Sequence, residues 1–123
     1  MPSPDDLSLA GVVEFRALID KYNPQVPEGL RDPKYTLEKY SFIGLEGFVN
    51  AKVVVEALRR AGVNLTRQSF RQALESLHNL DLGIGAPLAF SPERHQGLDS
   101  VYFTRVDGER WVPISDWTVA LRV

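Results

Sequence analysis

Residues 41–62, with the sequence SFIGLEGFVNAKVVVEALRRAG, contain the most regular apolar pattern in the chain. Large apolar side chains recur there close to the period of a helix, which predicts an amphipathic helix with one broad apolar face. That face is formed by Phe42, Leu45, Phe48, Val49, Val53, Val55 and Leu58. Gly62 stands where helices commonly end in a left-handed residue, and Arg59 and Arg60 occupy the last turn, where the helix dipole favours cations. We therefore expect a helix over residues 41–61.

A second helix is predicted upstream, over residues 4–22. Ser3 can cap it, Pro4 suits the first helical position, and Asp5 and Asp6 would face the positive end of the helix dipole. The apolar period continues through Leu9, Val12, Val13, Phe15, Leu18, Ile19 and Tyr22. Residues 23–40 show no stable period and contain three prolines and a glycine. They predict a long surface loop with a short helical turn near Thr36.

A third helix is predicted from Thr66, which suits the N-cap position, to about His78. Leu65 and Phe70 have the spacing of a hydrophobic staple across this N-terminus. The helical period is carried by Phe70, Ala73, Leu74 and Leu77.

Strand-like patterns follow the helices. We expect a flexible connector at residues 82–87, a short strand at 88–90 and a longer strand at 101–106. Asp107-Gly108 is a two-residue hairpin signal, and residues 110–114 read as the return strand. Residues 115–123 are expected to form a further strand or a tail. Helices followed by a hairpin would indicate an α+β domain if the domain were complete.

Composition restricts the class of protein. The chain has 123 residues, of which 44% are hydrophobic and 24% charged, so it is predicted to fold and not to remain disordered. It has no cysteine, which excludes disulfides and thiolate chemistry. A net charge of −2 argues against nucleic acid as the main partner. The first residues, MPSPDDLSLAG, lack the basic and apolar regions of a signal peptide.

No motif in the chain announces catalysis or a cofactor. Gly83-Ile84-Gly85 lacks the third glycine of a dinucleotide-binding loop, because Leu88 stands there. The two histidines, His78 and His95, have no metal-ligand spacing with carboxylates. We therefore expect a protein that is not an enzyme and has neither a metal site nor a cofactor. A cluster of arginines can serve a small anion, a partner or only a solvated helix end; it consists of Arg59, Arg60, Arg67 and Arg71.

Three segments resemble branched-chain amino-acid-type (type I) periplasmic substrate-binding proteins, the receptors of ATP-binding-cassette importers. The first segment is residues 41–62. The second, residues 64–77, is similar to a family helix with a threonine at its start and Ala-Leu-Glu near its end. The third, residues 81–97, contains the Phe-Ser-Pro and His-Gln-Gly groups that precede the family's terminal hairpin. Their order matches the C-terminal portion of the family.

The resemblance implies an α/β protein of two lobes that close on a ligand in the cleft between them. It places residues 1–82 in the first lobe, 83–90 in a hinge-like connector and 91–123 in the second lobe. Most of the family's parallel strands and its signal peptide have no counterpart in this sequence. We therefore interpret the chain as a C-terminal fragment of this fold, three helices followed by a hairpin, and expect it not to bind an amino acid tightly by itself.

The resemblance also implies a function and a site. The function is uptake of branched-chain amino acids or similar small solutes, in the periplasm, together with a transporter permease. The start of the helix at residues 41–61 can face the cleft, and its free N–H groups suit a carboxylate. The candidate ligand residues are Phe42, Leu45 and Glu46.

The alternative is a small stand-alone interaction or regulatory protein that reuses this part of the fold as a dimer. In either case the apolar helix faces need a cover, because large apolar patches are not stable in water. We expect a homo-oligomer formed through Phe48, Val49, Val53 or the face of Phe70.

Overall fold

The computed structural model describes residues 1–120. Its elements are α1 (Ala10–Tyr22), the 3-10 helix η1 (Glu28–Leu30), α2 (Phe42–Ala61), α3 (Arg67–Glu75), β1 (Thr104–Asp107), β2 (Arg110–Pro113) and α4 (Trp117–Ala120). Three helices followed by a β-hairpin are therefore confirmed. The last segment differs from the expected strand or tail, because residues 117–120 form a short helical turn. Residues 121–123, which also belong to that expectation, lie outside the described residues.

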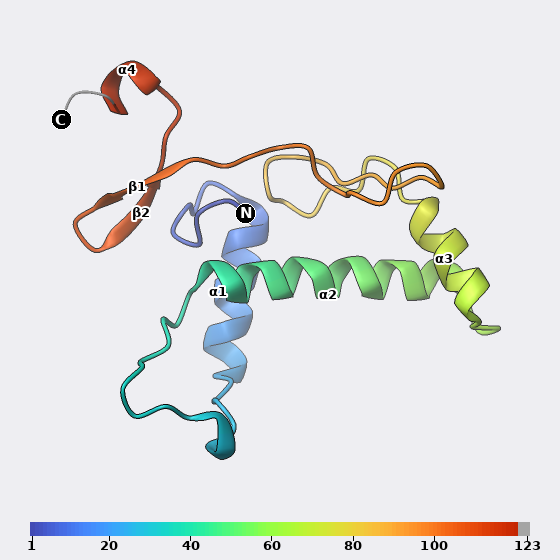
Figure 1. Ribbon diagram of the computed structural model, residues 1–123, viewed down its shortest axis with the longest axis horizontal. Coiled ribbons are helices and arrows are strands. Elements are labelled where there is room, and N and C mark those ends of the chain that lie inside the picture. The colour runs from blue at the N-terminus through green and yellow to red at the C-terminus, as the bar shows by residue number, and fades with distance from the viewer. Residues whose placement is uncertain (121–123) are drawn as a thin grey trace.

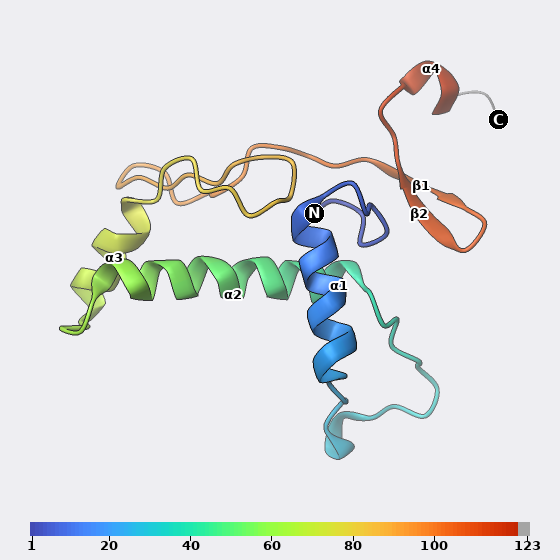
Figure 2. The same cartoon turned by 180° about the vertical axis from the view of Figure 1, so that it is seen from behind.

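The helix α2 is the axis of the molecule (Figure 1). The helix α1 crosses α2 near its N-terminal half, and α3 packs at its C-terminal end. From α3 the chain returns along α2 towards the hairpin, and the reverse view shows the same arrangement (Figure 2). This return brings residues 77–100 over one side of α2, where they complete the core.

Both ends of α2 follow the sequence prediction. The Ser41 hydroxyl accepts a hydrogen bond from the Gly44 backbone N–H at 3.0 Å, which satisfies one of the free donors of the first turn. At the other end, Gly62 has a φ of 74° and donates its N–H to the Leu58 carbonyl. A side chain would strain this left-handed backbone, so glycine suits the position.

The core is formed by one face of α2, by α1 and by the returning chain. Its buried members are Val12, Phe15, Leu45, Val49, Val53, Leu77, Leu82, Ile84 and Leu88. The Phe48 ring adds a contact with the Phe15 ring at 5.7 Å between centroids. The buried face of α2 is therefore narrower than the apolar face predicted from the sequence, since Val55 and Leu58 are 44% and 39% exposed.

One sequence-based expectation is wrong as a result. Val49 and Val53 are buried within this chain and are not free to join two copies. The predicted helix to His78, connector at 82–87 and short strand at 88–90 give no indication that this part of the chain folds back over α2. In the structure Leu77, Ile84 and Leu88 cover them as part of one core cluster.

The predicted start of the first helix is also wrong, because α1 begins at Ala10 and not at Pro4. Ser3 does not cap a helix; it is 1% exposed, and its hydroxyl donates a hydrogen bond to the Trp111 carbonyl at 2.5 Å. The Asp5 carboxylate accepts from the Trp111 N–H at 3.0 Å and pairs with Arg16. These residues hold the hairpin, a tertiary role that overrides their local preference for a helix start.

Beyond Thr66, α3 begins as predicted but ends early. The side chain of Thr66 accepts from Ser69 N–H and the side chain of Ser69 accepts from Thr66 N–H, which forms a capping box. The helix stops at Glu75 and not near His78, and Asn79 adopts a left-handed φ of 53°. Because the helix ends here, Leu77 lies in the core, and its carbonyl accepts a hydrogen bond from the Phe90 N–H.

Shorter strands than expected follow. Residues 88–90 form only isolated bridge contacts, with Leu80 paired to Leu88. The hairpin pairs Thr104 with Pro113 and Asp107 with Arg110, so its turn residues are Gly108 and Glu109 and not Asp107 and Gly108. Gly108 supplies the positive φ of 63° that this turn needs.

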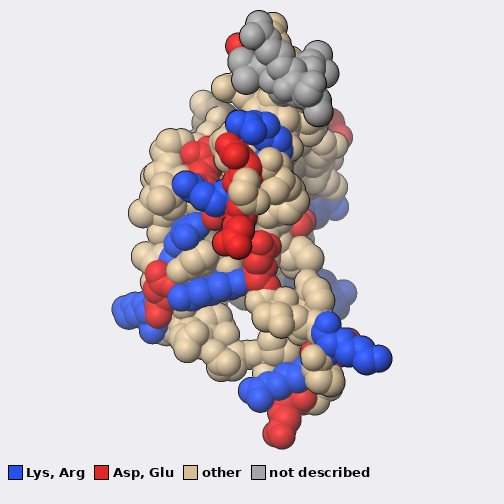
Figure 3. Space-filling view, turned by 90° about the vertical axis from the view of Figure 1, so that its left-hand side faces the viewer, with Lys and Arg blue, Asp and Glu red and all other residues tan. Residues whose placement is uncertain are grey.

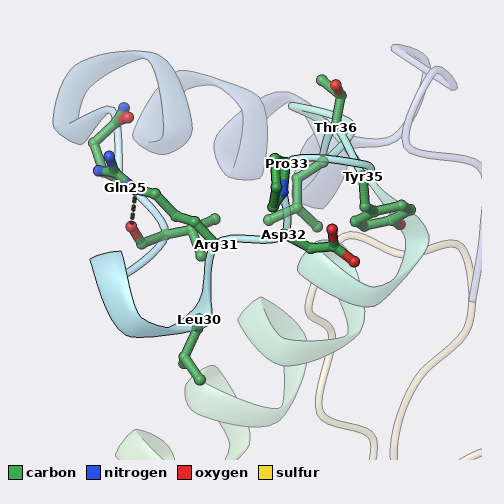
Figure 4. Close-up of a pocket in the computed structure, with 9 residues that line it drawn as sticks. Gln25, Leu30, Arg31, Asp32, Pro33, Tyr35 and Thr36 are labelled. Carbon is green, nitrogen blue, oxygen red and sulfur yellow. Dashed lines mark hydrogen bonds between the residues drawn. The ribbon is translucent and has the colours of Figure 1, made fainter.

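Residues 23–40 form the predicted long loop, although its helical turn lies at residues 28–30 and not near Thr36. The loop extends away from the helices (Figure 1). It surrounds a hollow that is visible in the lower part of the space-filling view (Figure 3). A close-up shows the residues that line it, among them Leu30, Arg31 and Tyr35 (Figure 4). Within the loop, Arg31 Nε donates to the Val26 carbonyl at 3.0 Å.

Candidate functional site

The candidate site is a cavity of about 440 Å³ between α2 and the returning chain. One wall consists of Glu46, Val49, Asn50, Val53 and Val54 from α2. The other consists of Met1, Leu88, Phe90, Gly97 and Leu98. Helical spacing explains the first wall, because residues four apart lie on one face of α2. The cavity is mostly apolar, with two polar side chains on one side.

The three ligand residues predicted from the sequence lie in three different surroundings. Phe42 packs its ring edge-on against Trp111 of the hairpin, with 5.5 Å between centroids. Leu45 is fully buried in the core. Glu46 is exposed and lines the cavity. One turn of α2 therefore joins the hairpin, the core and the cavity, and the ligand role of these residues stays a prediction.

Asn50 lies one turn beyond Glu46 on the same wall of the cavity. In the described part of the chain, neither side chain has a hydrogen-bond or ion-pair partner, so a carboxylate and an amide are both free to meet a solute. A carboxylate accepts hydrogen bonds from an ammonium group, and an amide both donates and accepts them. Asn50 is not among the ligand residues predicted from the sequence, although its spacing of four residues from Glu46 places the two on one face of the helix.

Charged groups gather on the other side of the start of α2. Lys39 pairs with Asp20 at 2.6 Å, and the Tyr40 hydroxyl donates to the same carboxylate oxygen. The hydrogen bond from Lys39, followed by that from Tyr40, holds the pKa of Asp20 below its usual value. The Arg16 guanidinium lies over the Tyr40 ring at 3.9 Å. Cations and carboxylates alternate on the surface of this end of the molecule (Figure 3), so it presents no single-sign patch.

The comparisons with known proteins agree with this architecture. The family model described as periplasmic binding protein matches residues 14–110, which include most of α1, all of α2 and α3, and the first strand of the hairpin. This chain belongs to the periplasmic binding protein family. The family binds small solutes, and the resemblance inferred from three segments is thereby confirmed.

A solved member with a similar structure is a possible leucine/isoleucine/valine-binding protein from Rhodopirellula baltica SH 1. The two chains are 28% identical and superpose with a TM-score of 0.77 over 98% of the present chain. The present chain spans 29% of the length of that relative. Among curated protein sequences, no relative matches.

Two further observations concern metal sites and membrane-spanning helices. Among residues 1–120, no group of three or more histidine, cysteine, aspartate or glutamate side chains is placed to hold a metal ion. In the same range, none of the helices combines the length and the apolar character required to cross a membrane.

Proposed function

We propose that this chain is part of a solute-binding component that serves uptake of branched-chain amino acids or similar small solutes by an ATP-binding-cassette importer. Membership of the periplasmic binding protein family supports a binding role over catalysis. The similarity to a possible leucine/isoleucine/valine-binding protein supports an apolar amino acid as the solute. A periplasmic location and a transporter permease as partner belong to the same proposal.

In this proposal residues 1–82 belong to the first lobe, 83–90 form the connector and 91–123 belong to the second lobe. Ile84 is fully buried and Leu88 is 5% exposed, both against residues of α1 and α2. Because buried residues move with the core that holds them, hinge bending would fall beyond Leu88. The chain spans 29% of its solved relative, so further chain would be required to complete a two-lobed cleft.

The observation that carries the proposal is the cavity beside α2 with Glu46 and Asn50 at its edge. The Glu46 carboxylate would accept hydrogen bonds from the ammonium group of the amino acid. Val53, Val54 and the opposite wall of the cavity would cover the apolar side chain of the amino acid. Phe42 and Leu45 would hold this turn of α2 in place through the hairpin and the core. Since the cavity is half-open, only part of the solute loses its contact with water, and affinity depends on how completely a ligand is enclosed.

Titration of the chain with L-leucine, followed by amide NMR shifts, tests the proposal. We expect shifts at Glu46, Asn50 and Val54 with a dissociation constant of about 1 mM or weaker. Glu46→Gln removes the charge and should weaken binding about tenfold, whereas Glu28→Gln, an exposed change in η1, should leave it unchanged. Micromolar, stoichiometric binding by the isolated chain would contradict the expectation that this chain does not bind an amino acid tightly by itself. Shifts confined to other residues would contradict the proposed site.

We also propose that the chain self-associates, through a different face from the one expected. A second stripe without charged residues runs along α2 and consists of Ile43, Gly47, Ala51, Val54 and Leu58. Of these, Ile43 is 80% exposed and Val54 is 44% exposed. A helix that is apolar on both faces is typical of a buried position, so this outward face of α2 is the contact we propose between two copies.

A further inference from the structure

A second cavity, of about 450 Å³, lies between α3 and the turn at residues 90–95. It is lined by Phe70, Arg71, Leu74, Glu75, Phe90 and His95. It shares Phe90 with the cavity beside α2 but none of that cavity's other residues. The two cavities are therefore separate sites that have one aromatic side chain in common.

The apolar wall of the second cavity is held firmly in place. Phe90 donates its N–H to the Leu77 carbonyl at 2.8 Å, and Leu77 is fully buried. A side-chain carbon at Gly97 would lie 2.6 Å from the Phe90 ring, so the ring fits here because residue 97 is a glycine. On the other wall, Phe70 and Leu74 lie four residues apart on one face of α3. The cavity is thus shaped by packing that does not depend on a ligand.

The polar edge of the cavity carries a carboxylate whose charge is already balanced. Arg71 Nε donates to Glu75 Oε1 at 2.7 Å, and His95 Nε2 lies 3.2 Å from the same oxygen. The hydrogen bond from Arg71, with a smaller effect of His95, lowers the pKa of Glu75. The side chain of Glu75 is 12% exposed, whereas that of Arg71 is 66% exposed. Within residues 1–120, the two terminal nitrogens of Arg71 have no partner.

We propose that this cavity binds a small monocarboxylate with an apolar body. The free edge of the Arg71 guanidinium presents N–H donors in the planar geometry that a carboxylate accepts. The apolar body would lie against Phe70, Leu74 and Phe90. An organic ammonium fits less well, because Glu75, the one carboxylate among the described residues that line the cavity, is paired with Arg71 and lies beside His95. The site goes beyond the proposed function, since it lies apart from Glu46 and Asn50 and selects for the opposite charge.

Three probes of equal length test the proposal: hexanoate, hexylammonium and hexanol. In amide NMR titrations of the chain, hexanoate should shift the residues around Arg71 and Phe90 and bind at least tenfold more tightly than hexylammonium. Arg71→Gln should weaken hexanoate binding about tenfold, and Arg71→Lys should weaken it less. Arg67→Gln, at the exposed start of the same helix, is the matched control and should change nothing.

Glu75→Gln separates this site from a cation site. Removal of the carboxylate frees Arg71, so hexanoate should bind as tightly as before or several-fold more tightly. Tighter binding of hexylammonium than of hexanoate, loss of hexanoate binding in Glu75→Gln, or equal effects of Arg71→Gln and Arg67→Gln would each overturn the proposal. Absence of saturable shifts with hexanoate would overturn it as well. Glu46→Gln should leave hexanoate binding unchanged, so failure of the leucine site and failure of this site are distinguishable.

Discussion

At the residue scale, two glycines let the returning chain pass directly against α1. The Gly11 N–H donates to the Gly83 carbonyl at 2.8 Å. A side-chain carbon at Gly11 would lie 2.3 Å from the Leu82 carbonyl oxygen, and one at Gly83 would lie 2.4 Å from the Gly11 nitrogen. These contacts are with backbone, which cannot rotate away. The close approach carries Leu82 and Ile84 into the core, so both glycines serve packing.

Gly11→Ala is therefore expected to destabilise the fold by about 1–3 kcal/mol, because overpacking forces the backbone to shift. The control is Gly47→Ala, at an exposed position of α2 where an added side chain meets nothing within 4 Å. Alanine is the better helix former, so that change should stabilise the chain by about 0.5–1 kcal/mol. Urea unfolding followed by far-UV circular dichroism measures both. Equal stability of the two variants would show that the α1 contact is not close.

At the element scale, α3 and the turn at residues 90–95 are joined by the pair of Arg71 and Glu75 with His95. The lowered pKa of Glu75 gives this link a pH dependence. A carboxyl group whose pKa is lower in the folded state contributes stability above its unfolded value, here 4.5, and loses it as the pH falls through the folded value. Acid should therefore loosen the turn from α3.

The expected result is a steeper loss of stability between pH 6 and pH 3 in the unchanged chain than in Glu75→Gln. Urea midpoints at several pH values measure it, and the comparison cancels the titration of the other carboxyl groups. As a control, Glu93→Gln changes a carboxylate in the same turn that accepts a hydrogen bond from the Ser91 hydroxyl. Parallel pH profiles for the unchanged chain and Glu75→Gln would argue against the link.

Elements whose signals are local were predicted from the sequence. The ends of α2 rest on Ser41 and Gly62, and the start of α3 rests on Thr66, each of which acts within one helical turn. Elements that depend on distant contacts were misplaced. Ser3 reads as a helix cap, yet its hydroxyl bonds to Trp111, 108 positions away. No local pattern contains that contact.

The candidate site shows the same division. Glu46 could be chosen from its position in α2, because helix periodicity gives the direction of its side chain relative to its neighbours. The opposite wall, with Phe90 and Leu98, depends on how residues 77–98 fold back over α2. The early stop of α3 and the left-handed Asn79 set that path, and neither follows from the apolar period. The resemblance to a family supplied the fold class that periodicity alone did not.

At the scale of the whole molecule, one small core holds two extended arms (Figure 1). The hairpin reaches the core through few contacts. Ser3 and Asp5 hold both backbone groups of Trp111, and the Tyr102 hydroxyl donates to the Ile84 carbonyl at 2.8 Å. Phe42 adds the ring contact with Trp111. The start of α2 is therefore in direct contact with the hairpin, so a shift of the hairpin would displace this turn of α2.

Part of the exposed apolar surface lies on the outward face of α2, which is the proposed contact between two copies. Ile43 and Leu58 are 80% and 39% exposed at this face, and Val54 is 44% exposed. If two copies meet there, the double change Ile43→Lys and Leu58→Lys places charges in the contact and should convert dimers to monomers. Val63→Lys is the control, because Val63 is 99% exposed and lies beyond the helix.

Light scattering over a range of protein concentrations measures this outcome directly. The unchanged chain and Val63→Lys should show a concentration-dependent mass above that of one chain, whereas the double variant should stay at 13.8 kDa. Circular dichroism should show the same helix content for all three, because none of the changed side chains belongs to the core. If the unchanged chain is monomeric at all protein concentrations, two copies do not meet through α2. Oligomers that persist in the double variant would move the contact to another surface, for example the loop at residues 23–40.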